Sequence, residues 1–82
     1  MTMQLLCQLD TNDFPGWKRD FDAEATDRME AGLTLLQMWR DTDSRSGVYL
    51  LFEVGNRGRA EQWLRKEQGF GGPMTATFLE TA

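Results

Sequence analysis

Trp39 and Arg40, at the edge of a polar turn, are the first residues in the sequence whose types suggest chemistry. A tryptophan ring offers a flat wall for a planar aromatic molecule, and an arginine guanidinium can hold a phenolate or carboxylate by charge-assisted hydrogen bonds. The alternative is structural: Trp39 covers sheet surface, and Arg40 pairs with a loop acid such as Asp41 or Asp43. Both residue types are common in interfaces that do no chemistry, so the structural interpretation is the ordinary one.

Glu53 is the second candidate, with Tyr49 on the same face of one expected strand. A glutamate buried in a half-apolar seam has its charged form disfavoured and can act as a general base. The alternative is a solvated strand glutamate, which is the commoner case. Polar side chains on neighbouring strands would complete the lining of a ligand site on this face. We therefore predict a ligand-binding role for Trp39, Tyr49, Gln8 and Gln37, and name Glu53 and Arg40 as the only catalytic candidates.

The sequence has no histidine and a single cysteine, Cys7. The missing histidine excludes Ser-His-Asp and Cys-His catalysis, HExxH zinc chemistry and a histidine-ligated haem. We expect neither a metal nor a bound cofactor. Because Cys7 lies in an apolar run, it is expected to be a small core residue, and a lone cysteine favours a reducing compartment.

The net charge of −4 comes from residues 1–32, which hold seven acidic and three basic side chains. An acidic chain is a poor partner for nucleic acid, whose binding depends on neutralised phosphates. The start, MTMQLLCQL, has no basic region and is too short for a signal peptide or membrane span. We expect a cytoplasmic protein that contacts neither nucleic acid nor membrane.

The pattern of apolar residues predicts one domain, residues 1–82, in the order βαββαβ. Strands are expected over 3–9, 33–40, 48–54 and 74–80, with Gly47 at positive φ in the loop between the second and third. One helix of about four turns begins after Asp13, carries the apolar stripe Phe14, Trp17, Phe21, Ala25 and Met29, and ends at Gly32. A second helix begins after Asn56, buries Ala60, Trp63 and Leu64, and ends at Gly69, before a flexible loop at 69–72 that could act as a lid.

Two right-handed crossovers place both helices on one face of a four-stranded antiparallel sheet, an α+β, ferredoxin-like arrangement. The opposite face combines apolar and polar side chains: Gln4, Leu6, Gln8, Tyr49, Leu51, Glu53 and, if Met38 pairs with Leu50, Leu35, Gln37 and Trp39. Such a face is too apolar to be left wholly in water. A second copy of the chain, packed sheet to sheet, is the expected partner.

Several residues resemble a known group of proteins. The run Asp13, Trp17, Phe21, followed by Arg28, Gly32, a strand ending in Arg40 and the LFEV of residues 51–54, resembles the small dimeric α/β-barrel proteins. The antibiotic-biosynthesis-monooxygenase-like and cyclase-like members are the most similar. The segment KEQGFGG before the last strand is shorter than theirs, and DTDSRSG replaces their usual hairpin turn. The resemblance implies a homodimer of ferredoxin-like subunits that close into an α/β barrel.

Members of that group include cofactor-free oxygenases, isomerases and haem-degrading enzymes, and the missing histidine disfavours the last. The resemblance therefore implies a homodimer that binds a small planar organic ligand, with a cofactor-free monooxygenase- or cyclase-like reaction. The alternative is a non-catalytic dimeric accessory or interaction module. Fold alone does not decide between them.

Overall fold

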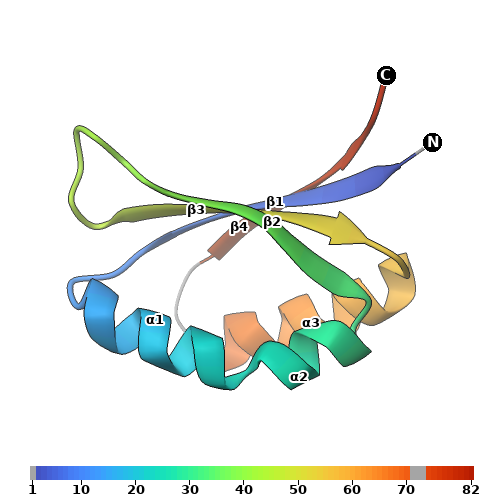
Figure 1. Ribbon diagram of the computed structural model, residues 1–82, viewed down its shortest axis with the longest axis horizontal. Coiled ribbons are helices and arrows are strands. Elements are labelled where there is room, and N and C mark those ends of the chain that lie inside the picture. Colours follow the sequence, from blue (N-terminus) through green and yellow to red (C-terminus); the bar gives the residue numbers. More distant parts are fainter. Residues whose placement is uncertain (1, 71–73) are drawn as a thin grey trace.

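The computed structural model describes residues 2–70 and 74–82, without the side chains of 68–70. Its elements follow the order βααββαβ (Figure 1), with these bounds: β1 Met3–Asp10, α1 Phe14–Ala23, α2 Ala25–Glu30, β2 Leu33–Arg40, β3 Gly47–Val54, α3 Arg57–Phe70 and β4 Met74–Glu80. All four predicted strands are confirmed. None of the helices in the described ranges has the length and apolar character needed to span a bilayer.

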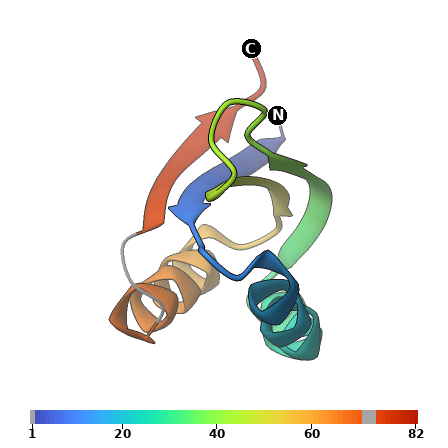
Figure 2. The same ribbon diagram turned by 90° about the vertical axis from the view of Figure 1, so that its left-hand side faces the viewer.

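The four strands form one antiparallel sheet in the order β2-β3-β1-β4. All three helices lie on one face of this sheet, with α1 and α2 end to end along one side and α3 along the other (Figures 1 and 2). Within the described residues, no helix or strand covers the other face. The predicted ferredoxin-like α+β fold is therefore confirmed.

The core lies between the sheet and the helices. Successive side chains on a strand point to opposite faces, so alternate residues of β1 and β3 meet the helices. Five of them are at most 1% exposed: Leu5, Cys7, Val48, Leu50 and Phe52. The Phe52 ring meets Phe21 of α1 at 6.4 Å and Trp63 of α3 edge-on at 5.8 Å between centroids, which ties both helices to the sheet.

The predicted first helix is broken in two, which corrects its apolar stripe. Met29 is 74% exposed and Ala25 is also exposed, whereas Arg28 is only 7% exposed. The guanidinium of Arg28 donates a hydrogen bond to the carbonyl of Phe21 and lies 3.6 Å from the centre of its ring. Because that carbonyl has a side-chain partner, the helix ends at Ala23 and restarts with a different face inward.

A β-bulge in β2 corrects one member of the predicted outer face. Met38 pairs with Leu50, as predicted, and Gln37 pairs with Leu51. The register shifts between Leu35 and Gln37, however, so that Leu35 pairs with Phe52 and falls on the helix side. An extra residue on one strand moves everything before it to the opposite parity, which simple alternation does not anticipate.

The turns are partly as predicted. Gly32 has a φ of +73° and its carbonyl accepts a 2.7 Å bond from the Gly55 N–H, so it ends the helix as expected. Gly47 does not have a positive φ. A Cβ at this position would lie 2.8 Å from that of Asp41, so a larger residue would clash there. The N-cap Asn56 accepts a bond from the Arg59 N–H at 3.0 Å.

The end of the second helix also differs from the prediction, because α3 continues past Gly69 to Phe70. Residues 69 and 70 of the predicted lid belong to α3, and residues 71 and 72 lie outside the described residues.

Candidate functional site

The structure brings three of the predicted ligand-binding residues together on the outer face of the sheet. Trp39, Tyr49 and Gln8 are direct cross-strand neighbours on β2, β3 and β1. The Gln8 amide donates to the Tyr49 hydroxyl at 3.1 Å, and that hydroxyl lies 3.5 Å from a carboxylate oxygen of Asp41. Gln37 lies on the same face, beside Leu51.

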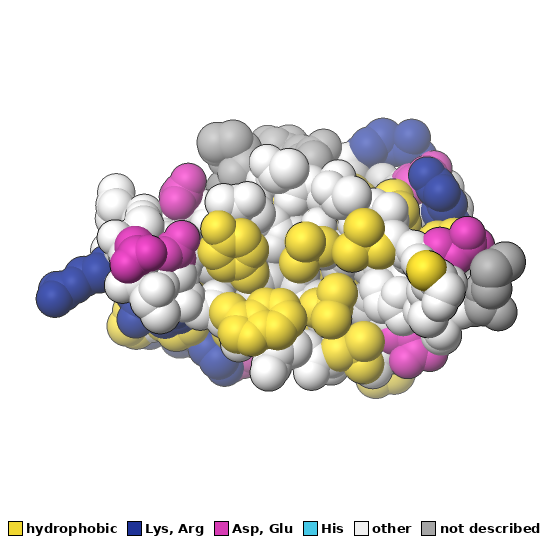
Figure 3. All heavy atoms as spheres, turned by 90° about the horizontal axis from the view of Figure 1, so that it is seen from above, with side chains coloured by type: hydrophobic (Ala, Val, Ile, Leu, Met, Phe, Trp, Pro, Cys, Tyr) yellow, Lys and Arg dark blue, Asp and Glu magenta, His cyan; other side chains and the backbone are white. Residues whose placement is uncertain are grey.

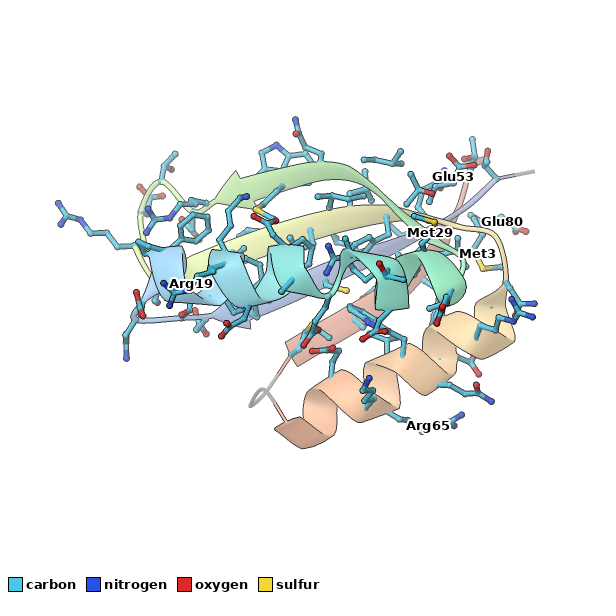
Figure 4. All side chains as sticks on the ribbon, turned by 60° about the horizontal axis from the view of Figure 1, so that its bottom comes forward. Met3, Arg19, Met29, Glu53, Arg65 and Glu80 are labelled. Carbon is cyan, nitrogen blue, oxygen red and sulfur yellow. The ribbon has the colours of Figure 1, made fainter. Side chains whose placement is uncertain are left out.

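The two catalytic candidates lie elsewhere. Glu53 is exposed and four residues from Tyr49 along β3, about 13 Å away at strand spacing. Figure 4 places it near Met3 and Glu80, at the end of the sheet that holds the chain termini. Arg40 points to the opposite face from Trp39: it lies 4.5 Å from the Phe14 ring and donates to the Arg45 carbonyl at 2.8 Å. The structure thus does not combine Arg40 with Trp39 or with Glu53.

The outer face is a surface with a central apolar patch (Figure 3). Its most exposed large apolar side chains belong to the edge strands: Leu36 is 47% exposed, Trp39 43% and Leu79 42%. Two hollows stand out among the described residues, and neither is lined by Trp39, Tyr49, Gln8 or Gln37. The ligand-binding role of these four residues stays a prediction.

The better-formed hollow is a cleft of about 240 Å³ between α1, α3 and the inner face of the sheet, which we call the helix cleft. Its apolar walls are Leu9, Trp17, Phe21, Leu50, Trp63 and Met74, and its polar members are Asp20, Glu24 and Glu67. Concave apolar sites with a few polar groups are the usual form of small-molecule sites. The other hollow, between α2 and α3, is a shallow depression on the surface.

Two carboxyl groups face each other across the helix cleft. Burial, a side-chain hydrogen bond with Glu24 and the charge of Glu24 raise the pKa of Glu67 from 4.5 to about 7, against the opposing charges of Lys66 and Arg28. Two carboxyls this close cannot both ionise cheaply, so one keeps a proton up to neutral pH. Such a group can accept or donate a proton near pH 7, as a general acid or base must.

Trp63 adds an unsatisfied donor to this site. The residue is 7% exposed, and its indole N–H has no hydrogen-bond partner among the described residues. A buried polar group without a partner is uncommon and costs free energy. On the other wall, Trp17 stacks on Phe21 with 5.0 Å between ring centroids and 22° between planes.

The two cleft glutamates were not predicted from the sequence, although a signal existed. Glu67 follows Trp63 and Leu64 by four and three residues, so it continues the buried face of α3. Glu24 likewise follows Phe21 by three residues, directly after the end of α1. An acid on an apolar stripe is the pattern that points to a perturbed carboxyl.

Comparison with known proteins gives a fold but no close relative. No protein-family model matches the sequence, and no curated protein is significantly similar. Among solved structures, an EthD-family protein from Bacillus halodurans shares 14% identity with a TM-score of 0.65, covering 100% of both chains. A putative antibiotic biosynthesis monooxygenase from Deinococcus radiodurans shares 13% identity with a TM-score of 0.57, covering 100% of this chain and 93% of its own.

The chain shares its fold with the antibiotic-biosynthesis-monooxygenase-like proteins. A NIPSNAP domain protein from Burkholderia xenovorans has the same fold, with 16% identity, a TM-score of 0.60 and coverage of 100% of this chain and 95% of its own. The resemblance noted in the sequence is therefore confirmed at the level of the fold. Identities this low say nothing about ligand or reaction, which must be argued from the helix cleft itself.

Proposed function

We propose that the protein binds a small planar organic molecule in the helix cleft and exchanges a proton with it through Glu67. The observation that carries this proposal is the cleft itself: apolar and aromatic walls around a carboxyl whose pKa is raised to about 7. The volume of about 240 Å³ suits a one- or two-ring compound. Burying such a compound against Trp17 and Trp63 supplies the binding free energy.

A monooxygenase- or cyclase-like reaction is the activity we propose for this site. Its first step is loss of a ligand proton to Glu67, which leaves an electron-rich anion. In a cofactor-free oxygenation that anion reduces O₂: a CH₂ group of the ligand becomes C=O, the ligand supplies all four electrons and both hydrogens, and the second oxygen atom leaves as water. A carboxyl with a raised pKa among apolar and aromatic walls supports this class of reaction.

Ligand binding is tested by thermal shift with planar phenols and quinones, on the intact chain and two variants. A ligand at 100 times its dissociation constant adds about 2.7 kcal/mol, which for a domain this size raises the melting temperature by about 10–20 °C. Trp17→Ala removes a cleft wall and should abolish the shift, whereas Trp39→Ala on the outer face should keep it. Loss of the shift in Trp39→Ala but not in Trp17→Ala would place the ligand on the outer face. No shift with any compound would refute the proposal.

The outer face is proposed to pair with that of a second copy, completing a dimeric α/β barrel. Leu36, Trp39 and Leu79 are each more than 40% exposed there, beside the half-buried Leu51. Leu51→Arg places a charge in the seam and should give a monomer by light scattering at micromolar concentration. Met29→Arg is the matched control, because Met29 is 74% exposed on α2, away from this face. A monomeric native protein would refute the dimer.

A non-catalytic dimeric module is the second candidate. It is favoured by one observation: Glu53 and Arg40, the catalytic candidates of the sequence, are both exposed and lie on opposite faces of the sheet. Ligand binding without oxygen consumption or product formation would support this candidate over an enzyme.

A further inference from the structure

The charges around the helix cleft restrict what it can bind. Among the described residues, its lining holds three carboxyl groups and no basic side chain. The nearest cations have other partners: Arg28 is bonded to the Phe21 carbonyl, and the Lys66 ammonium lies 3.7 Å from Asp27. The charges of Arg28 and Lys66 offset part of this negative charge from outside the lining, but an anionic ligand would lie directly against carboxyl groups, so the lining favours a neutral or positively charged guest.

The aromatic walls favour a positively charged guest over a neutral one. Trp17 stacks on Phe21, and the Arg28 guanidinium already lies 3.6 Å from the centre of the Phe21 ring, so we assign the aromatic contact with a guest to Trp17. Aromatic faces attract cations electrostatically, and the attraction is greatest where water is excluded. An ammonium group bound here would be attracted both by the carboxyl groups and by the aromatic face beside them.

Given the ligand site of the proposed function, on which this inference rests, we propose that the ligand is an aromatic amine. Its ammonium lies between the carboxyls of Glu24 and Glu67, where these now hydrogen-bond to each other, and its ring lies along Trp17 and Trp63. The proton that the two carboxyls hold at neutral pH leaves for the solvent as the ammonium enters, so binding exchanges one positive charge for another.

Isothermal titration of the full chain at pH 7 with a matched set of compounds tests this inference. Tyramine carries the ammonium, tyrosol replaces it with a hydroxyl, and 4-hydroxyphenylacetate carries a carboxylate on a similar ring. We expect tyramine to bind at least ten times more tightly than tyrosol, and 4-hydroxyphenylacetate least tightly of the three. The tyramine heat should depend on the ionisation enthalpy of the buffer, which reports the released proton.

Variants separate the site from general attraction to an acidic protein. Glu67→Gln should reduce tyramine affinity to the level of tyrosol while leaving tyrosol binding unchanged. Glu61→Gln, which removes a carboxyl from the same helix outside the cleft, should change neither.

Each contrary result has a distinct meaning. If tyrosol binds as tightly as tyramine, the inference that the ligand is an amine is wrong, but the proposal that the cleft binds a ligand stands. Equal loss of tyramine affinity in Glu67→Gln and Glu61→Gln would overturn it as well, because the attraction would then come from net charge. If none of the three compounds binds, and none of the neutral phenols and quinones does either, both this inference and the proposed function are wrong.

Discussion

The glutamate pair makes the stability of the protein depend on pH in an unusual direction. Glu67 has a pKa of about 7 in the folded chain and an ordinary value of 4.5. Below pH 4.5 it is protonated in both states and contributes no pH dependence. Between 4.5 and 7 the unfolded chain releases a proton that the folded chain keeps, so the free energy of unfolding falls as the pH rises. Above pH 7 Glu67 is ionised in both states, and the free energy of unfolding falls no further on its account.

The magnitude follows from the two pKa values. A fully buried carboxyl with this difference would lose about 3 kcal/mol of stability across that interval. Glu67 is half-exposed, so solvent screening reduces the expected loss to about 1–2 kcal/mol. Glutamine resembles the protonated acid at every pH. Glu67→Gln should therefore match the native protein near pH 4.5 and exceed its stability by about 1–2 kcal/mol at pH 8.

Urea unfolding followed by tryptophan fluorescence at four pH values, at one protein concentration, measures this difference. Glu80→Gln is the control, since this carboxyl is exposed on β4 and lies outside the cleft lining. A Glu67→Gln difference that is constant between pH 4.5 and 8, or one reproduced by Glu80→Gln, would refute the raised pKa and with it the proton-exchange role.

Three further predictions concern the frame of the site. Arg28→Met keeps the apolar stem but leaves the Phe21 carbonyl without its guanidinium partner, and should cost about 1–3 kcal/mol in urea unfolding. Gly32→Ala forces a Cβ into a φ of +73° and to 3.1 Å from the Asn56 nitrogen; it should cost about 1–2 kcal/mol, seen as a melting temperature lower by about 5–10 °C. Burial raises the pKa of Cys7 to about 12, so its thiol should resist iodoacetamide at pH 8 for as long as the chain is folded and react rapidly in urea; fast labelling without denaturant would contradict its burial.

The fold was predictable because each strand carries a strong local signal. β2 and β4 occupy the predicted ranges, and β1 and β3 each differ by one residue. The alternation of apolar residues along β1 and β3 also indicates which side chains face the helices, and four of these, Leu5, Cys7, Leu50 and Phe52, are buried there. The β-bulge in β2 was not predictable by the same reasoning, because strict alternation carries no sign of an inserted residue.

The candidate site was only partly predictable. Cross-strand pairing brings Trp39, Tyr49 and Gln8 together, which follows from parity and the correct pairing of Met38 with Leu50. Arg40 is adjacent to Trp39 in sequence and for that reason points to the other face. A cleft between two helices depends on how far apart they pack, and this distance is set by tertiary contacts that no single-helix pattern contains.

The break between α1 and α2 connects the largest error of the sequence reasoning to the proposed chemistry. A continuous helix would carry the apolar stripe on to Ala25 and Met29. In the structure, Arg28 takes the Phe21 carbonyl, and Glu24 becomes the residue between two short helices. Glu24 there reaches Glu67 of α3, and Arg28 lies close enough for its charge to act on both acids. Arg28→Met should therefore shift the titration of Glu67 upward as well as destabilise the chain, because the positive charge that lowers its pKa is removed.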